Sequence, residues 1–296
     1  MCSSDLGAVT LGLHFVSVPA EQGIGLAAVG ISAVVLMLFG WRQRRAPNPL
    51  FDLAIAQRRI FWVAALTGLI VFGTLVGSMY VGQQYVQNVL GYSTLEAGLS
   101  AIPLSLAMIA VSPVAAIAVE RIGSRMTMLI GVGLVFVGVA LMFTWREGAS
   151  YLPVGLAYAV IGVGIGLSGT PASRSIMAAV PAHRSGMGSG MTDLQRDLGV
   201  AVMQSLLAVF LTREYMTSVD GQLATVPSDK RSLVTDQVAG ILRASFGGAQ
   251  EIAQRYPQYA DVILDGARSA FTKGSAAAII AALVAIALGF LVTLVW

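Results

Sequence analysis

HRSGMGSGMTDLQRDLGVAVMQSLLAVFLT, residues 183–212, is long enough to cross a bilayer and is the only candidate span with charges in its interior, at Asp193, Arg196 and Asp197. Ionisable groups at membrane depth cost free energy, so they indicate function by default. The stretch therefore predicts a membrane helix whose three charges either carry chemistry or hold neighbouring helices together.

The composition of the whole chain agrees with this interpretation. Of its 296 residues, 56% are hydrophobic and only 11% are charged, whereas about 25% of residues are charged in a typical soluble domain. The apolar residues are gathered into long runs rather than spread at the spacing of a soluble helix or strand. We therefore expect an all-α, polytopic helical membrane protein.

Metal and catalytic chemistry have little support in the sequence. The single cysteine, Cys2, excludes an intrachain disulfide and a cysteine-based zinc cluster. The two histidines, His14 and His183, are far apart, and no nucleophile–base pattern is visible. We expect no enzyme activity, no metal site, no cofactor and no nucleic-acid partner.

The apolar runs divide the chain into three parts. Residues 1–45 form a linker-helix region whose first span is cut short, as if the native amino terminus were missing. Residues 46–59 contain Pro47 and Pro49 and predict a stiff cytoplasmic linker. Residues 60–296 predict a six-span bundle. The predicted spans are a partial one at 6–18 and full ones at 23–41, 60–83, 95–119, 126–145, 151–173, 183–212 and 272–296.

A hydrophilic segment, residues 213–270, separates the last two spans. Leu233 to Ser245 and Tyr259 to Ala267 have the apolar spacing of amphipathic helices. Two alternatives remain open for this external loop, a folded cap over the bundle and a solvated loop.

The placement of arginine predicts the orientation in the membrane. If Trp41 to Arg45 is cytoplasmic, nine arginines fall in short cytoplasmic segments and one, Arg146, in the opposite short loops. We therefore expect a multi-pass protein of the cell membrane with a cytoplasmic carboxyl terminus and an extracytoplasmic segment 213–270. The nine are Arg42, Arg44, Arg45, Arg58, Arg59, Arg121, Arg125, Arg174 and Arg184.

Local motifs predict how the spans begin, turn and pack. Ser93 and Glu96 have the spacing of a capping box, which begins a helix. Residues 120–125, ERIGSR, predict a tight polar turn. Gly162 and Gly166 form a pair of small residues that allows another helix to approach closely. Pro171 closes the same span.

Three stretches resemble a known family. QYVQNVLGYS (84–93), followed by EAGL (96–99), resembles the outer end of the first span in the second half of drug:proton antiporters with fourteen spans, which belong to the major facilitator superfamily. ERIGSR (120–125) is similar to the superfamily's cytoplasmic turn D-R-x-G-R-R. Arg121, Gly123 and Arg125 match it, whereas Glu120 replaces aspartate and Ser124 replaces arginine. The family's helix start is matched by Pro181, Gly186, Ser189, Gly190 and the run Arg196-Asp197-Leu198-Gly199.

The resemblance covers residues 41–212 well and 213–296 loosely. It implies the carboxyl-terminal part of an exporter that moves small lipophilic molecules in exchange for protons by alternating access. It also implies a partner within the same transporter, an amino-terminal half of six spans. Two other functions stay open: a carrier of the same fold for a single nutrient or metabolite, and a non-transporting membrane subunit or sensor.

The three charges have two interpretations. Asp193, Arg196 and Asp197 lie at positions i, i+3 and i+4, so Asp193 can reach both others on one helical face. Two carboxylates that share one arginine would leave one acid able to bind and release a proton. Alternatively, the three form a structural ion pair near the cytoplasmic gate. Their depth, ~12 Å along the helix from Ser185, favours the structural alternative.

A polar stripe near the outer end of span 60–83 is the second candidate site. Tyr80, Gln84, Gln87 and Asn88 would suit a cavity for a lipophilic, often cationic, ligand. The alternative is an interfacial belt, where tyrosine and amide side chains meet lipid headgroups.

Overall fold

The computed structural model describes residues 58–146, 150–226 and 234–295, together with single helical positions between residues 30 and 45. Every regular element in these ranges is a helix, as predicted, and five of the helices are long and apolar enough to cross a membrane. The predicted partial span 6–18 and most of the predicted linker 46–59 lie outside the described residues. The helices are α4 (Arg59–Asn88), α5 (Thr94–Leu99), α6 (Ile102–Leu141), α7 (Leu152–Ala179), α8 (Ser185–Ala224), α9 (Asp236–Ala244), α10 (Phe246–Arg255) and α11 (Ala260–Val295).

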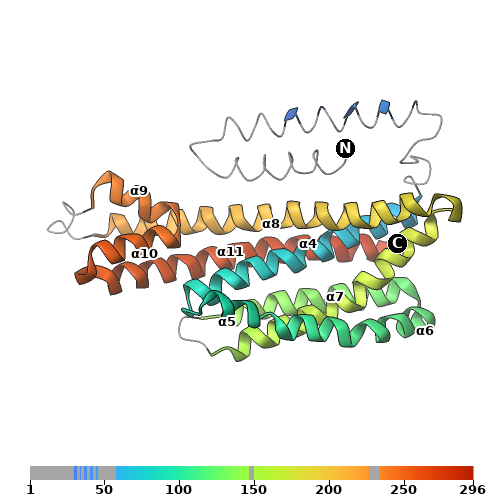
Figure 1. Ribbon diagram of the computed structural model, residues 1–296, viewed down its shortest axis with the longest axis horizontal. Helices are drawn as coiled ribbons and strands as arrows, with labels where there is room; N and C mark the ends of the chain where they lie inside the picture. The colour runs from blue at the N-terminus through green and yellow to red at the C-terminus, as the bar shows by residue number, and fades with distance from the viewer. Residues whose placement is uncertain are drawn as a thin grey trace.

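Helix α6 contains the turn predicted at residues 120–125. Its 40 residues are interrupted at Gly123, where φ is 83° and ψ is 160°, a backbone conformation open essentially to glycine alone. The chain reverses direction there (Figure 1). The arm before Gly123 and the arm after it both pack on α7, so α6 supplies two membrane-length segments.

Glycines allow the two arms of α6 to approach α7 closely. A Cβ atom on Gly162 of α7 would overlap the carbonyl oxygen of Leu104 in the first arm. On the other side, a Cβ on Gly131 of the second arm would lie 2.7 Å from the carbonyl oxygen of Gly164. Helix α7 is therefore held between the two arms with its glycines toward them.

One end of the bundle is marked by arginines. Arg58 Nη1 donates a hydrogen bond to the carbonyl oxygen of Ala179 at the end of α7, at 3.2 Å. Arg59 and Arg125 donate to the carbonyl oxygens of Val295 and Leu294, in the last turn of α11. Arginine side chains satisfy carbonyls that have no partner within the helix. We call this the arginine end.

The opposite end carries a folded helical cap. The spans predicted to end at residue 212 and to begin at residue 272 belong to longer helices, because α8 continues to Ala224 and α11 begins at Ala260. Hydropathy falls at Arg213 and Glu214, but a fall in hydropathy marks the edge of an apolar run and not the end of a helix. The cap consists of residues 213–226 and 234–270 and includes α9 and α10, which lie against the ends of α8 and α11 (Figure 1).

The cap is held by apolar and polar contacts between its helices. The rings of Phe246 in α10 and Phe271 in α11 meet edge to face, with centroids 6.2 Å apart. Thr235 caps the first turn of α9, and Ser245 does the same for α10. Of the two open alternatives for this segment, a folded cap therefore describes the structure. The second amphipathic stretch, 259–267, belongs to the start of α11 rather than to a separate helix, and α10 is not predicted at all.

Candidate functional site

Helix α8, which carries the three interior charges, packs tightly against α4. A Cβ atom on Gly73 of α4 would overlap the carbonyl oxygen of Gly199 in α8. A Cβ on Gly199 would in turn overlap the carbonyl oxygen of Leu69. The two backbones are thus in direct contact, as at other small-residue helix interfaces in membranes. The side chains around this contact are consequently fixed relative to both helices.

Gln195 lies in this interface and is 1% exposed. Its amide packs on Gly68 of α4, where an added Cβ would lie 2.5 Å from Oε1. Neither Oε1 nor Nε2 of Gln195 has a hydrogen-bond partner among the described residues. A buried amide without a hydrogen-bond partner costs free energy. Gln195 therefore lowers the stability of the α4–α8 interface. Gln195 is uncharged, so the pattern of charges in the sequence does not indicate it.

Replacing Gln195 by methionine is expected to raise the free energy of unfolding by about 1–3 kcal/mol. Methionine keeps the length of the side chain and removes the two unpartnered polar atoms. Thermal unfolding of the purified chain in detergent measures the change. The matched control is Gln222→Met in the cap, because Gln222 Nε2 donates a 3.1 Å hydrogen bond to the carbonyl oxygen of Gly266, and its loss should be destabilising. If both variants lowered the free energy of unfolding by the same amount, the amide of Gln195 would not be an unsatisfied buried group.

The charged residues of α8 are arranged differently from the predicted ion pair. The guanidinium carbon of Arg196 lies 4.6 Å from the centroid of the Phe72 ring in α4, which is a cation–π contact. Asp193 and Asp197 are exposed, and no salt bridge among the described residues joins either of them to Arg196. Arg196 therefore contacts α4, and the two carboxylates remain accessible on the surface of this bundle.

The polar stripe of α4 contains a row of three polar side chains. Asn88 Nδ2 donates to Gln84 Oε1 at 2.8 Å, and Tyr80 lies one helical turn before Gln84 on the same face. All three side chains are half-buried, as is Gln87, which lies beside the row. Tyr80 is eight residues beyond Phe72, about 12 Å further along α4 toward the cap. The candidate site thus consists of a polar row near the cap and a charged group nearer the arginine end.

An aromatic cluster fixes the cap-side end of α4 next to the polar row. The rings of Tyr85 and Trp145 are stacked with centroids 4.9 Å apart, and Tyr158 of α7 meets Trp145 edge to face at 6.0 Å. Tyr85 also donates a 2.7 Å hydrogen bond to the carbonyl oxygen of Arg146. The cluster joins α4, α7 and the end of α6, so the row is presented from a rigid support. The predicted capping box beside it is confirmed, since Ser93 and Glu96 exchange both hydrogen bonds.

The remaining predicted residues lie apart from this group. Glu120, Arg121, Gly123 and Arg125 form the exposed turn at the arginine end, where the hydroxyl of Thr127 donates a 2.9 Å hydrogen bond to the carbonyl oxygen of Gly123. In α7, Gly166 packs on Met108 of α6 as Gly162 packs on Leu104, and Pro171 is buried inside the helix. No group of three or more potential metal ligands occurs in the part of the chain that the structure describes.

Comparison with known proteins places this arrangement in a wider context. Residues 7–203 match the sequence profile of the Major Facilitator Superfamily. The chain is 36% identical over 186 residues to multidrug resistance protein Stp of Mycobacterium tuberculosis, an alignment that covers 61% of this chain and 34% of Stp. It is 31% identical over 281 residues to multidrug efflux pump LfrA of Mycolicibacterium smegmatis, which covers 92% of this chain and 53% of LfrA. It is also 31% identical over 198 residues to drug efflux pump JefA of M. tuberculosis, with 64% of this chain and 39% of JefA covered. The chain thus spans between about a third and a half of the length of these relatives.

Proposed function

The chain belongs to the major facilitator superfamily, and on this premise we propose that it forms the carboxyl-terminal half of a proton-coupled exporter of lipophilic small molecules. The observation that carries the proposal is the 31% identity to LfrA, which extends over 92% of this chain. The polar row of α4 and the carboxylates of α8 give the proposal its chemistry.

In the proposed mechanism, this bundle and an amino-terminal half of six spans rock against each other around a central cavity. Tyr80, Gln84, Gln87 and Asn88 face the substrate with ring and amide groups, which suit lipophilic and cationic molecules. Asp193 or Asp197 takes up and releases the proton. The contact between Arg196 and Phe72 transmits the charge state of α8 to α4, because it joins the two helices that carry these groups.

We further propose that the arginine end faces the cytoplasm and that the cap lies outside the cell membrane. Arg58, Arg59, Arg121 and Arg125 gather at one end of the bundle, and lysine and arginine are enriched in short cytoplasmic segments. Segment 213–270 is too long for its charges to predict orientation, so it does not oppose this orientation.

Labelling of single cysteines tests the orientation. In a Cys2→Ser background, Gln250→Cys on the exposed face of α10 is expected to react with a membrane-impermeant maleimide in intact spheroplasts. Glu120→Cys, in the exposed turn at the arginine end, is expected to react only after the membrane is opened. The reverse pattern would overturn the orientation.

The function itself is tested by efflux of ethidium from an efflux-deficient bacterial strain that expresses the transporter to which this chain belongs. We expect efflux that stops when a protonophore collapses the proton gradient. We also expect resistance to several chemically unrelated dyes. Saturable transport of one solute, with no protection against dyes, would favour the single-substrate carrier instead.

A further inference from the structure

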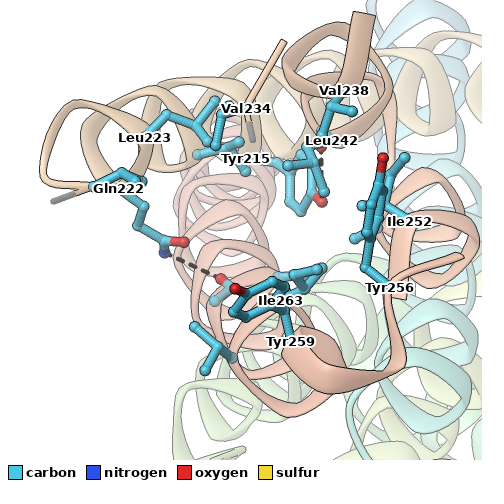
Figure 2. A pocket seen from close by; sticks show the side chains of 16 residues that line it. Tyr215, Gln222, Leu223, Val234, Val238, Leu242, Ile252, Tyr256, Tyr259 and Ile263 are labelled. Atoms are coloured by element: carbon cyan, nitrogen blue, oxygen red, sulfur yellow. Dashed lines mark hydrogen bonds between the residues drawn. The ribbon is translucent and has the colours of Figure 1, made fainter. Parts of the chain in front are cut away.

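The cap contains a half-open apolar cavity that none of the proposed steps uses. Its volume is about 240 Å³, slightly below the range of about 300–1,000 Å³ typical of ligand pockets. It lies between the extension of α8, helices α9 and α10, and the start of α11 (Figure 2). None of the 16 described residues that line it is charged.

The walls of the cavity are aromatic and aliphatic. Tyr215, Tyr256 and Tyr259 surround it from three sides, and Val238 and Ile263 complete the wall between them (Figure 2). Aromatic rings offer large contact areas to a ligand with little loss of conformational freedom. A compact lipophilic molecule would therefore contact side chains from every helix of the cap.

Two hydrogen bonds join helices that line the cavity. The hydroxyl of Tyr215 in α8 donates to the carbonyl oxygen of Leu242 in α9 at 3.2 Å, and Gln222 in α8 donates to Gly266 in α11 at 3.1 Å. The first bond joins α8 to α9 and the second joins α8 to α11, so both fix helices that contribute to the lining. The cavity is thus a built feature of the cap and not a gap between loosely packed helices.

The outer surface of the cap is polar. Three ion pairs lie on it, Arg243 with Asp220, Arg255 with Glu251 and Arg268 with Asp265. Such a surface faces water rather than lipid tails, so an apolar cavity beneath it gains free energy when a lipophilic molecule replaces water. A charged ligand would instead lose hydration without an opposite charge in the lining to compensate.

From the uncharged lining and the polar surroundings, we infer that the cap cavity is a binding site for an uncharged lipophilic small molecule. This site is separate from the polar row of α4. The inference does not rest on the proposed export function, because binding to the cap requires neither transport nor a proton gradient.

Protection of a cysteine from maleimide tests the inference. The full chain, in a Cys2→Ser background and in lipid nanodiscs, carries either Val238→Cys in the lining or Gln250→Cys on the exposed face of α10. The probe is N-phenyl-1-naphthylamine, which is uncharged and lipophilic. At ten times its dissociation constant, the probe should slow labelling of Val238→Cys by about tenfold and leave Gln250→Cys unchanged. Equal labelling of Val238→Cys with and without the probe would overturn the inference.

Two further measurements distinguish the site and its ligand class. Adding Ile263→Trp to Val238→Cys fills the cavity and should abolish protection, whereas Ile263→Leu, which conserves volume, should retain it. Ala253 of α10 is buried and lies outside the cavity lining, so a cysteine at position 253 that stays slow to label in the presence of each substitution establishes that the cap is folded. If the probe still protected Val238→Cys in the presence of Ile263→Trp, the probe would not bind in this cavity. If the cation ethidium protected Val238→Cys equally well, the site would not select uncharged ligands. Since purified protein is used, neither result depends on whether the transporter exports ethidium.

Discussion

Replacing Asp193 by asparagine is expected to reduce proton-driven export of ethidium to the level of cells without the transporter. Asp193 lies in the one span with interior charges, is exposed on the bundle and has no salt bridge among the described residues. Asparagine keeps the shape of the side chain but cannot exchange a proton. Ethidium efflux and substrate-induced proton flux in inverted vesicles measure the two sides of the coupling.

The controls separate proton coupling from folding. Asp193→Glu preserves a titratable carboxylate and should retain coupled export, whereas Glu251→Gln removes an exposed carboxylate of the cap and should have no effect on efflux. If Asp197→Asn abolishes ethidium efflux and proton flux while Asp193→Asn retains both, Asp197 is the acid that carries the proton. If Asp193→Asn leaves both ethidium efflux and proton flux at the original rates, Asp193 has no part in coupling.

Gly199→Ala is expected to destabilise the interface between α4 and α8. The added methyl group would overlap the carbonyl oxygen of Leu69, a backbone atom that can move only if α4 moves. Overpacking of this kind costs about 1–3 kcal/mol. The unfolding midpoint in detergent should fall accordingly, and proton-driven efflux should fall with it because α4 carries the polar row.

Gly190→Ala is the matched control on the same helix. A Cβ atom on Gly190 would have no other atom within 4 Å, and alanine is a better helix former than glycine by about 1 kcal/mol. We therefore expect Gly190→Ala to leave stability unchanged or to raise it slightly. A similar fall in the unfolding midpoint for both variants would show that the cost comes from the loss of glycine itself and not from contact with α4.

The sequence predicts the membrane part of the fold well because long apolar runs and turn residues are local signals. The turn at 120–125 depends on Gly123, and the start of α5 depends on the spacing of Ser93 and Glu96. The cap is predicted less well. Helix α10 has two glycines in its first turn and only ten residues, so its apolar pattern is too short to recognise. Its stability comes instead from contacts such as that of Phe246 with Phe271.

The candidate site shows the same division between local and tertiary information. Tyr80, Gln84 and Asn88 are spaced four residues apart, so a helix alone brings them into one row. Spacing also allows Arg196 to reach Asp193, but in the structure Arg196 contacts Phe72, which lies more than a hundred positions earlier in the sequence. Such a contact depends on the packing of α4 against α8. The burial of Gln195 also depends on the packing of α4 against α8.

The length of α8 has a mechanical consequence. Its 40 residues extend about 60 Å at 1.5 Å per residue, twice the hydrocarbon thickness of a bilayer, about 30 Å. Since α8 continues without a break from its contact with α4 at Gly199 into the cap, we expect it to move as one rigid rod when its membrane part tilts. A small tilt at the level of Gly199 becomes a larger displacement at Asp220. Spectroscopic probes placed at the tip of this rod should therefore report conformational cycling with greater amplitude than probes at the interface with α4.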